Sequence, residues 1–239
     1  MGTTLQGRVV AVTGAGGGIG RATCERLRAD GAVVHALDLR GVEGDRGHAV
    51  DVTDAESVEA AMAAVVERDG RLDGVVAAAG IVEDDVAAEE MSSAEFARVV
   101  AVNLQGVFHT LTAAGRQMLA RGSGSCVAIS SMSGNHTVNT PQRQCAYNAS
   151  KAGVSALVRS LAAEWAGRGV RVNAVAPGYV ETELLALKRH QFDQWLAHTP
   201  QGRMGTPDDV ASAIAYLLRD ESSYFCGSEL LMDGGYTLV

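Results

Sequence analysis

Short apolar runs alternate along this chain with longer segments of helical period, and this alternation restricts the fold more than any other feature. The runs cover residues 9–13, 33–37, 48–50, 74–78, 126–130, 171–175 and 229–233. Several are apolar at nearly every position, which is typical of parallel strands covered on both faces. We therefore expect an α/β fold with a doubly wound, seven-stranded parallel sheet between two helical layers.

The segments between these runs carry signals for the starts of helices. In three places a capping residue precedes an acid by three positions: Thr53 with Glu56, Ser92 with Glu95, and Thr206 with Asp209. Pro207 directly follows Thr206, where proline suits the first turn of a helix. Residues 182–200 are expected to form an inserted helical lid over the substrate. Because no linker or repeat interrupts the chain, we expect residues 1–239 to form a single domain.

Charge and cysteine usage narrow the classes of function. The 20 Lys plus Arg against 28 Asp plus Glu give a net charge of −8, which disfavours nucleic acid and anionic membranes as partners. No apolar run approaches the roughly 18 residues of a membrane span, and no signal peptide is expected. The four cysteines form no C-x-x-C pair, and no histidines lie three or four apart. We expect a cytoplasmic protein with reduced thiols and no metal.

A glycine-rich loop, Thr13-Gly14-Ala15-Gly16-Gly17-Gly18-Ile19-Gly20, follows the first apolar run and precedes a helical segment over residues 21–29. Glycine allows a tight turn and close backbone approach, so the amides at the start of the helix can face a pyrophosphate. In this strand, loop and helix context the loop predicts a Rossmann-type dinucleotide site; the alternative is a flexible turn.

An acid, Asp38, follows the second run. Its carboxylate can accept hydrogen bonds from both hydroxyls of an adenosine ribose and would repel a 2′-phosphate, which favours NAD over NADP. Leu39 supplies no cation that would neutralise such a phosphate. Because the next residue, Arg40, is a cation, NADP stays an alternative. We expect Asp51 and Val52 to hold the adenine; alternatively, Asp51 is an acid near the start of a helix.

Tyr147 and Lys151 open a helical segment that continues through Val154, Val158 and Leu161. Residues four apart lie on one helix face about 6 Å apart along the axis, so the phenol and the ammonium project together. The ordinary pKa of tyrosine is about 10. We expect the ammonium and a positively charged nicotinamide to lower it by stabilising the phenolate, so that Tyr147 can exchange a proton.

Two further polar residues accompany this pair. Ser131 follows the fifth run, where its hydroxyl can bond a substrate oxygen, and Asn103 lies in a helical segment, where an inward polar side chain needs a partner. Taken singly, each also fits a structural role, as a turn former or a satisfied buried amide.

Together these motifs make the chain similar to the short-chain dehydrogenase/reductase family over essentially its whole length. Thr13-Gly14-x-x-x-Gly18-x-Gly20 resembles the cofactor signature of that family, and Tyr147-x-x-x-Lys151 its active-site pair. Three further segments also resemble family motifs: Asn103-Leu104-x-Gly106-x-Phe108, Pro177-Gly178 followed by Thr182, and Asp233-Gly234-Gly235.

The resemblance implies a role for each matching residue. Tyr147 would be the general acid/base, and Lys151 would lower its pKa and bind the nicotinamide ribose. Ser131 would position the substrate oxygen, and Asn103 would hold a water in a proton relay. The nicotinamide carboxamide would be contacted by the segment that contains Pro177, Gly178, Val180 and Thr182.

The chain departs from the family pattern in two places. Ala77-Ala78-Ala79-Gly80 stands where the family usually has Asn-Asn-Ala-Gly, so we expect Ala79 and Gly80 to serve through their backbone. Tyr147 follows Ser131 by 16 residues, a longer interval than is common, so Ser133 stays an alternative for the serine role.

The loop between these residues is similar to that of polyol and ketose dehydrogenases of the galactitol, sorbitol and xylulose type. Its polar residues suit a hydroxyl-rich substrate or are merely those of a surface loop: Asn135, His136, Asn139, Gln142 and Gln144. We expect reversible hydride transfer between NAD and a secondary alcohol. The rivals are a 3-oxoacyl-[acyl-carrier-protein] reductase and a dinucleotide sensor without turnover.

The resemblance also implies a homotetramer that forms through the helices at 92–120 and 147–167.

Within residues 182–200, several residues are expected to form the mobile lid: Glu183, Leu184, Leu187, His190, Phe192 and Trp195.

Overall fold

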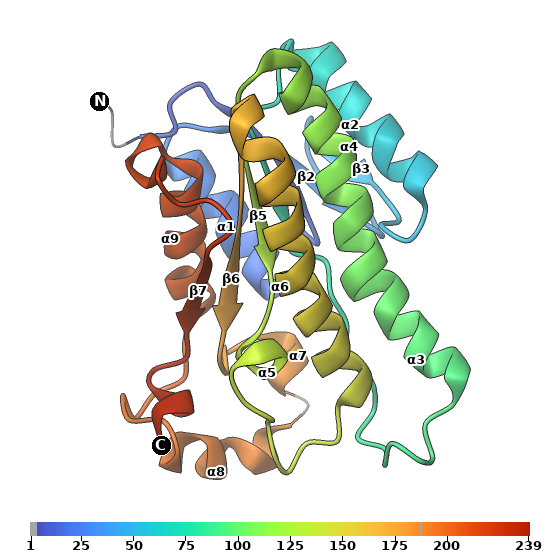
Figure 1. Ribbon diagram of the computed structural model, residues 1–239, viewed down its shortest axis with the longest axis vertical. Coiled ribbons are helices and arrows are strands. Elements are labelled where there is room, and N and C mark those ends of the chain that lie inside the picture. Colours follow the sequence, from blue (N-terminus) through green and yellow to red (C-terminus); the bar gives the residue numbers. More distant parts are fainter. Residues whose placement is uncertain (1–3, 187) are drawn as a thin grey trace.

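A computed structural model describes residues 4–186 and 188–239. In these residues seven parallel strands form one sheet in the order β3-β2-β1-β4-β5-β6-β7 (Figure 1). The strands are β1 (Val9–Thr13), β2 (Val33–Asp38), β3 (Gly47–Ala49), β4 (Gly74–Ala77), β5 (Gly124–Ile129), β6 (Val170–Pro177) and β7 (Glu229–Met232). The predicted doubly wound α/β sheet is confirmed, and each predicted run contains most of one strand.

Helices cover both faces of the sheet. On one face lie α1 (Gly18–Ala29) and α9 (Pro207–Leu218), which also pack against each other. The other face is covered by α2 (Ala55–Asp69), α4 (Gly106–Arg121) and α6 (Cys145–Trp165). The described residues contain four further α-helices, besides short 3₁₀ and π-helical turns: α3 (Ser93–Val100), α5 (Met132–Asn135), α7 (Glu183–Ala186) and α8 (Phe192–Ala197). In Figure 1, α5, α7 and α8 lie beyond the arrowheads of the strands.

Burial explains which strands are uniformly apolar. Every residue of β1 and β4, at the centre of the sheet, is buried, whereas β3 and β7 at its edges are partly exposed. A central strand faces helices on both sides, so neither face favours polar residues. The main boundary differences are at β5, which begins two residues before the predicted run, and at β6, which continues two residues beyond it to Pro177.

The predicted helix starts are correct at two of three places. Ser92 accepts a hydrogen bond from Glu95 N at the start of α3, and Thr206 and Asp209 form a reciprocal capping box at α9. The prediction for α2 is wrong by one residue, because Asp54 is its N-cap. Thr53 instead donates its backbone N–H and its hydroxyl to Asp51 Oδ1, at 2.8 and 2.7 Å.

Residues 182–200 form short helices, and part of this segment is firmly packed. Trp195 is completely buried and stacks on Tyr179 with ring centroids 4.1 Å apart. Both belong to an apolar cluster with Met132 and Met204. Leu187, one of the residues expected to form the lid, lies outside the described residues.

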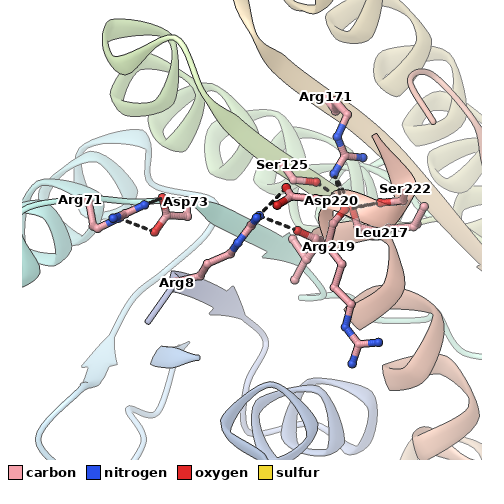
Figure 2. Close-up of polar contacts among 10 residues, drawn as sticks. Arg8, Arg71, Asp73, Ser125, Arg171, Leu217, Arg219, Asp220 and Ser222 are labelled. Carbon is pink, nitrogen blue, oxygen red and sulfur yellow. Dashed lines mark hydrogen bonds and ion pairs between the residues drawn. The ribbon is translucent and has the colours of Figure 1, made fainter. Parts of the chain in front are cut away.

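A polar network joins elements at the amino ends of the strands (Figure 2). This is the end of the sheet opposite α5, α7 and α8 (Figure 1). The Leu217 carbonyl near the end of α9 accepts hydrogen bonds from Ser125 Oγ, Arg171 Nη2 and Ser222 Oγ, each at 2.9 Å. Arg8 pairs with Asp220 at 2.6 Å. Carbonyls in the last turn of a helix lack helical partners, so these donors satisfy them and fix α9 against the sheet.

Candidate active site

The predicted site residues gather at the carboxyl ends of the central strands. The sheet order reverses its direction of winding between β1 and β4. Loops that leave neighbouring strands diverge at such a point, and open α/β sheets bind their ligands there. The glycine loop follows β1, Ala79 and Gly80 follow β4, and Ser131 follows β5.

The glycine loop is packed so closely that side chains cannot be accommodated. A Cβ atom on Gly14, which has a φ of 68°, would lie 2.6 Å from the backbone of Ala79. One on Gly20 would lie 2.0 Å from Gly14 O. No side chain caps the start of α1 at Gly17, so its amides are available to an anion. This cradle fits the pyrophosphate of a dinucleotide.

The alanines after β4 contact β1 and the glycine loop through their backbone. Ala78 N donates to Thr13 O at 3.3 Å, and the backbone of Ala79 closes against Gly14. A Cβ on Gly80 would lie 3.5 Å from Asn103 Oδ1 and 3.6 Å from Lys151 Nζ. The segment that departs from the family pattern therefore still joins the glycine loop to the predicted catalytic residues.

Asp38 lies beside the glycine loop, as its predicted role requires. Its Oδ2 accepts a hydrogen bond from Gly16 N at 3.0 Å, and Oδ1 accepts one from Arg40 N at 3.4 Å. Leu39 next to it is 67% exposed. This arrangement places a carboxylate directly beside the glycine loop, and its contact with an adenosine ribose stays a prediction.

The predicted adenine residues are already engaged within the protein. Asp51 Oδ1 accepts hydrogen bonds from the backbone N–H and the hydroxyl of Thr53. This matches the alternative interpretation of Asp51 as an acid near the start of a helix. Val52 is buried, and a Cβ on Gly106 would approach it to 2.7 Å. Contact of Asp51 and Val52 with adenine stays a prediction.

Tyr147 and Lys151 lie one turn apart near the start of α6, with Lys151 Nζ 5.6 Å from the centroid of the Tyr147 ring. Lys151 is buried, and Nζ donates to Ile129 O at 2.8 Å. Burial lowers the pKa of Lys151 to about 8, because the charged form loses its solvation. The two side chains are brought together as the spacing predicts.

The pKa of Tyr147 lies above its ordinary value in the protein without cofactor. Burial is the largest cause and raises it, hydrogen bonding with Ser131 lowers it, and the negative charge of Glu83 raises it. The expected lowering by Lys151 together with an oxidised nicotinamide stays a prediction, and it has to overcome this desolvation of the phenolate.

Both candidate serines line the pocket that contains Tyr147. Ser131 caps α5, and its Oγ lies 2.9 Å from Ser133 Oγ. Ser131 is close enough to Tyr147 to lower the pKa of the phenol, which favours Ser131 for the serine role, and Ser133 Oγ lies within hydrogen-bond distance of Ser131 Oγ.

Asn103 lies in a π-helical turn, Ala101–Gln105, between α3 and α4. Its Oδ1 accepts a hydrogen bond from Ile81 N at 2.8 Å. Its Nδ2 donates to Ile81 O at 2.9 Å and to Ser150 Oγ at 3.1 Å. Single π-turns inside helices are frequent at functional sites. Asn103 thereby ties the segment after β4 to α6, and its predicted role toward a water stays a prediction.

Sequence reasoning missed Glu83. This side chain is only 2% exposed, and its carboxylate accepts hydrogen bonds from Ala146 N at 2.9 Å and Tyr147 N at 3.1 Å. It thus satisfies free N–H groups at the start of α6. The only signal in the sequence is an acid in a loop after a strand, which identifies no partner.

The polar loop before Tyr147 divides into two parts. Asn139, Gln142 and Gln144 are buried and line the pocket; Asn139 Nδ2 donates to the side-chain oxygens of both glutamines at 2.8 Å. Asn135 and His136 do not line it, and His136 pairs with Glu229 at 2.9 Å. Asn135 and His136 are exposed, so these two fit the alternative of ordinary surface-loop residues.

The segment after β6 approaches the cofactor cradle. A Cβ on Gly18 would lie 3.0 Å from Thr182 Cγ2, so Thr182 covers the glycine loop. Gly178 borders the Tyr147 pocket, and Val180 is buried. Pro177 ends β6, so all four residues predicted at the carboxamide lie along the path from the sheet to the lid.

The chain is similar to known proteins in sequence and in fold. Residues 14–237 match the family described as Enoyl-(Acyl carrier protein) reductase. The galactitol 2-dehydrogenase (L-tagatose-forming) of Cereibacter sphaeroides is 45% identical over 248 residues, which cover 98% of this chain and 96% of that protein. The D-threitol dehydrogenase of Mycolicibacterium smegmatis is 39% identical over 249 residues, which cover 98% and 94%.

Among solved structures, that of the NADPH-dependent 3-quinuclidinone reductase from Rhodotorula rubra superposes with a TM-score of 0.91 at 32% identity, covering 99% of this chain and 94% of that one. Fold and site thus define an oxidoreductase that acts on CH–OH groups with a nicotinamide cofactor. The chain belongs to the short-chain dehydrogenase/reductase family.

Proposed function

We propose that the protein oxidises a secondary alcohol of a polyol to the ketone with NAD, and catalyses the reverse reduction. The observation that carries this proposal is one pocket in which Tyr147 and Ser131 lie beside the buried amides of Asn139, Gln142 and Gln144. Asn139 pairs with the side-chain oxygens of both glutamines, so the side-chain nitrogens of Gln142 and Gln144 are the donors left for a substrate, and an apolar substrate would leave them unpaired. Relatives that act on galactitol and threitol support the same class.

Each residue of the site has a separate role in the proposed reaction. NAD, when bound, supplies the acceptor for the hydride. The Ser131 hydroxyl holds the substrate oxygen, and Tyr147 removes the proton from it. Lys151 binds the nicotinamide ribose, and its positive charge favours the phenolate. With the cation of the cofactor, it opposes the rise in the pKa of Tyr147 that burial causes.

NAD is proposed over NADP because of Asp38. A 2′-phosphate at the adenosine ribose would meet this carboxylate, and repulsion between two anions weakens binding. The same argument, with the net charge of −8, disfavours the rival reductase of an acidic acyl carrier, which would need NADPH and a basic docking surface.

We also propose a homotetramer and a cytoplasmic location. Phe96 of α3 and Phe108 of α4 are 42% and 46% exposed, and exposed large apolar side chains on these helices favour contact with another subunit. The free cysteines suit a reducing compartment. Among the described residues, no helix is both long and apolar enough to cross a membrane.

Oxidation of galactitol and threitol, followed by the absorbance of NADH, tests the activity. Tyr147→Phe removes the proton acceptor and is expected to lower kcat by about 10²- to 10⁴-fold. Tyr224→Phe alters a fully exposed tyrosine and serves as the matched control. Activity of Tyr147→Phe equal to that of the parent would overturn the catalytic assignment.

A further inference from the structure

Lys188, in the lid, presents a buried ammonium at the substrate pocket. It lines the pocket together with Tyr147 and Ser131. Its Nζ is buried and has no hydrogen-bond partner within residues 4–186 and 188–239. A buried ammonium without partners is unfavourable, because burial removes its hydration and nothing replaces it.

The acids around Lys188 form hydrogen bonds or ion pairs with other groups, or they are exposed to solvent. Glu83, Asp84 and Asp85 are near enough to oppose the lowering of the Lys188 pKa that burial causes. However, the Glu83 carboxylate caps α6, and Asp85 pairs with Arg143 at 3.1 Å. Asp84 is exposed. None of the three replaces the solvation that the ammonium has lost.

The other residues that line the pocket carry no formal charge. Among the described residues that line the pocket, Lys188 is the single cation and there is no Asp or Glu. The other polar groups are the amides and hydroxyls that suit a polyol chain. Such a pocket is complementary to a substrate with several hydroxyls and one negative charge.

We propose that the substrate is a polyhydroxy carboxylic acid, whose carboxylate pairs with Lys188 while Tyr147 and Ser131 act on one of its secondary alcohols. This inference rests on the proposed function and specifies its substrate class. A carboxylate is favoured over a phosphate because a single cation matches a single negative charge. Lys188 is thus a specificity-determining residue, not part of the proton transfer.

Matched pairs of substrate test this proposal: galactonate against galactitol, and threonate against threitol, each assayed with NAD. The parent protein is expected to oxidise the acid of each pair with the higher kcat/KM. Lys188→Met should reduce this preference about tenfold or more, mainly through KM, since a charge-assisted hydrogen bond is lost. Lys188→Arg keeps the charge and should retain more of the preference than Lys188→Met.

A neighbouring cation provides the control. Arg189 is exposed and does not line the pocket, so Arg189→Met should leave the preference for the acid unchanged. Calorimetric titration of galactonate in the presence of NADH, which cannot accept a hydride, should show binding to the parent that Lys188→Met weakens, which detects the contact even if the variant is a poor catalyst.

The possible outcomes separate the two proposals. Oxidation of the neutral polyols in preference to their acids would overturn the carboxylate contact and leave the polyol dehydrogenase activity intact. A preference for the acids that survives in Lys188→Met would also overturn it. If the protein oxidises neither member of either pair and titration detects no galactonate, both proposals fail.

Discussion

The carboxylate of Glu83 accepts a hydrogen bond from the backbone N–H of Tyr147, the residue whose phenol lies in the substrate pocket. One buried acid from the loop after β4 thereby fixes the start of the helix that carries both Tyr147 and Lys151. Its negative charge also raises the pKa of Tyr147. Glu83 is a positioning residue with an electrostatic effect.

Replacing Glu83 should therefore change both stability and pH dependence. Glu83→Ala leaves two buried N–H groups without acceptors and should lower the free energy of unfolding by about 1–3 kcal/mol. Glu83→Gln keeps an acceptor but removes the charge. Because that charge raises the pKa of Tyr147, the alkaline rise of kcat/KM for alcohol oxidation should move to lower pH in Glu83→Gln.

A pH profile of the oxidation measures this shift. Glu90→Gln removes an exposed acid of the same region and should leave the profile in place. A purely structural role for Glu83 predicts reduced activity with an unmoved profile, and that result would contradict the electrostatic effect.

Lys151 should make the cofactor-free protein less stable near neutrality. Its pKa is about 8 in the folded protein, below the ordinary value of 10.5, so the unfolded chain binds more protons between these two pH values. The contribution of Lys151 to the free energy of unfolding is thus unfavourable below about pH 8 and rises as the pH approaches about 10.5.

Lys151→Met should accordingly stabilise the protein at about pH 7 while abolishing activity. A pKa difference of this size corresponds to about 3 kcal/mol, and loss of the hydrogen bond to Ile129 O offsets about 1 kcal/mol of it. Urea unfolding at several pH values measures the difference, which should shrink as the pH rises. A variant less stable than the parent at every pH would refute this account.

Asp38 should set the choice between NAD and NADP. Asp38→Ala removes the carboxylate beside Gly16 and should raise the ratio of kcat/KM for NADP over NAD by about tenfold or more, since hydrogen bonds to charged groups contribute roughly 1.5–3 kcal/mol. Assays with both cofactors measure the ratio. Asp45→Ala, whose side chain is 92% exposed, is the control. A parent protein that prefers NADP would exclude this role for Asp38.

Phe108 offers a test of assembly. If α4 contacts a further subunit, Phe108→Glu places a charge in an apolar interface and should reduce the particle mass measured by light scattering. Val138→Glu, at a 71% exposed apolar residue of the loop before α6, controls for added surface charge. A parent protein that scatters as a monomer would contradict the proposed tetramer.

The sequence by itself determined the features that depend on neighbours along the chain. Strand positions follow from local apolar runs, such as residues 9–13 and 74–78, because a strand buried on both faces needs apolar residues at every position. The glycine loop follows from the close approach that only glycine permits at Gly14 and Gly20. The pairing of Tyr147 with Lys151 follows from the pitch of one helix.

The tertiary structure alone decided what depends on residues distant in sequence. Glu83 lies 64 residues before Tyr147, and no local pattern indicates that it caps α6. The π-turn around Asn103 and the division of the polar loop between pocket and surface likewise need contacts across the fold. The direction of the Tyr147 pKa also required the structure. Desolvation depends on how completely surrounding elements exclude water, and the spacing of two side chains on a helix carries no information about that.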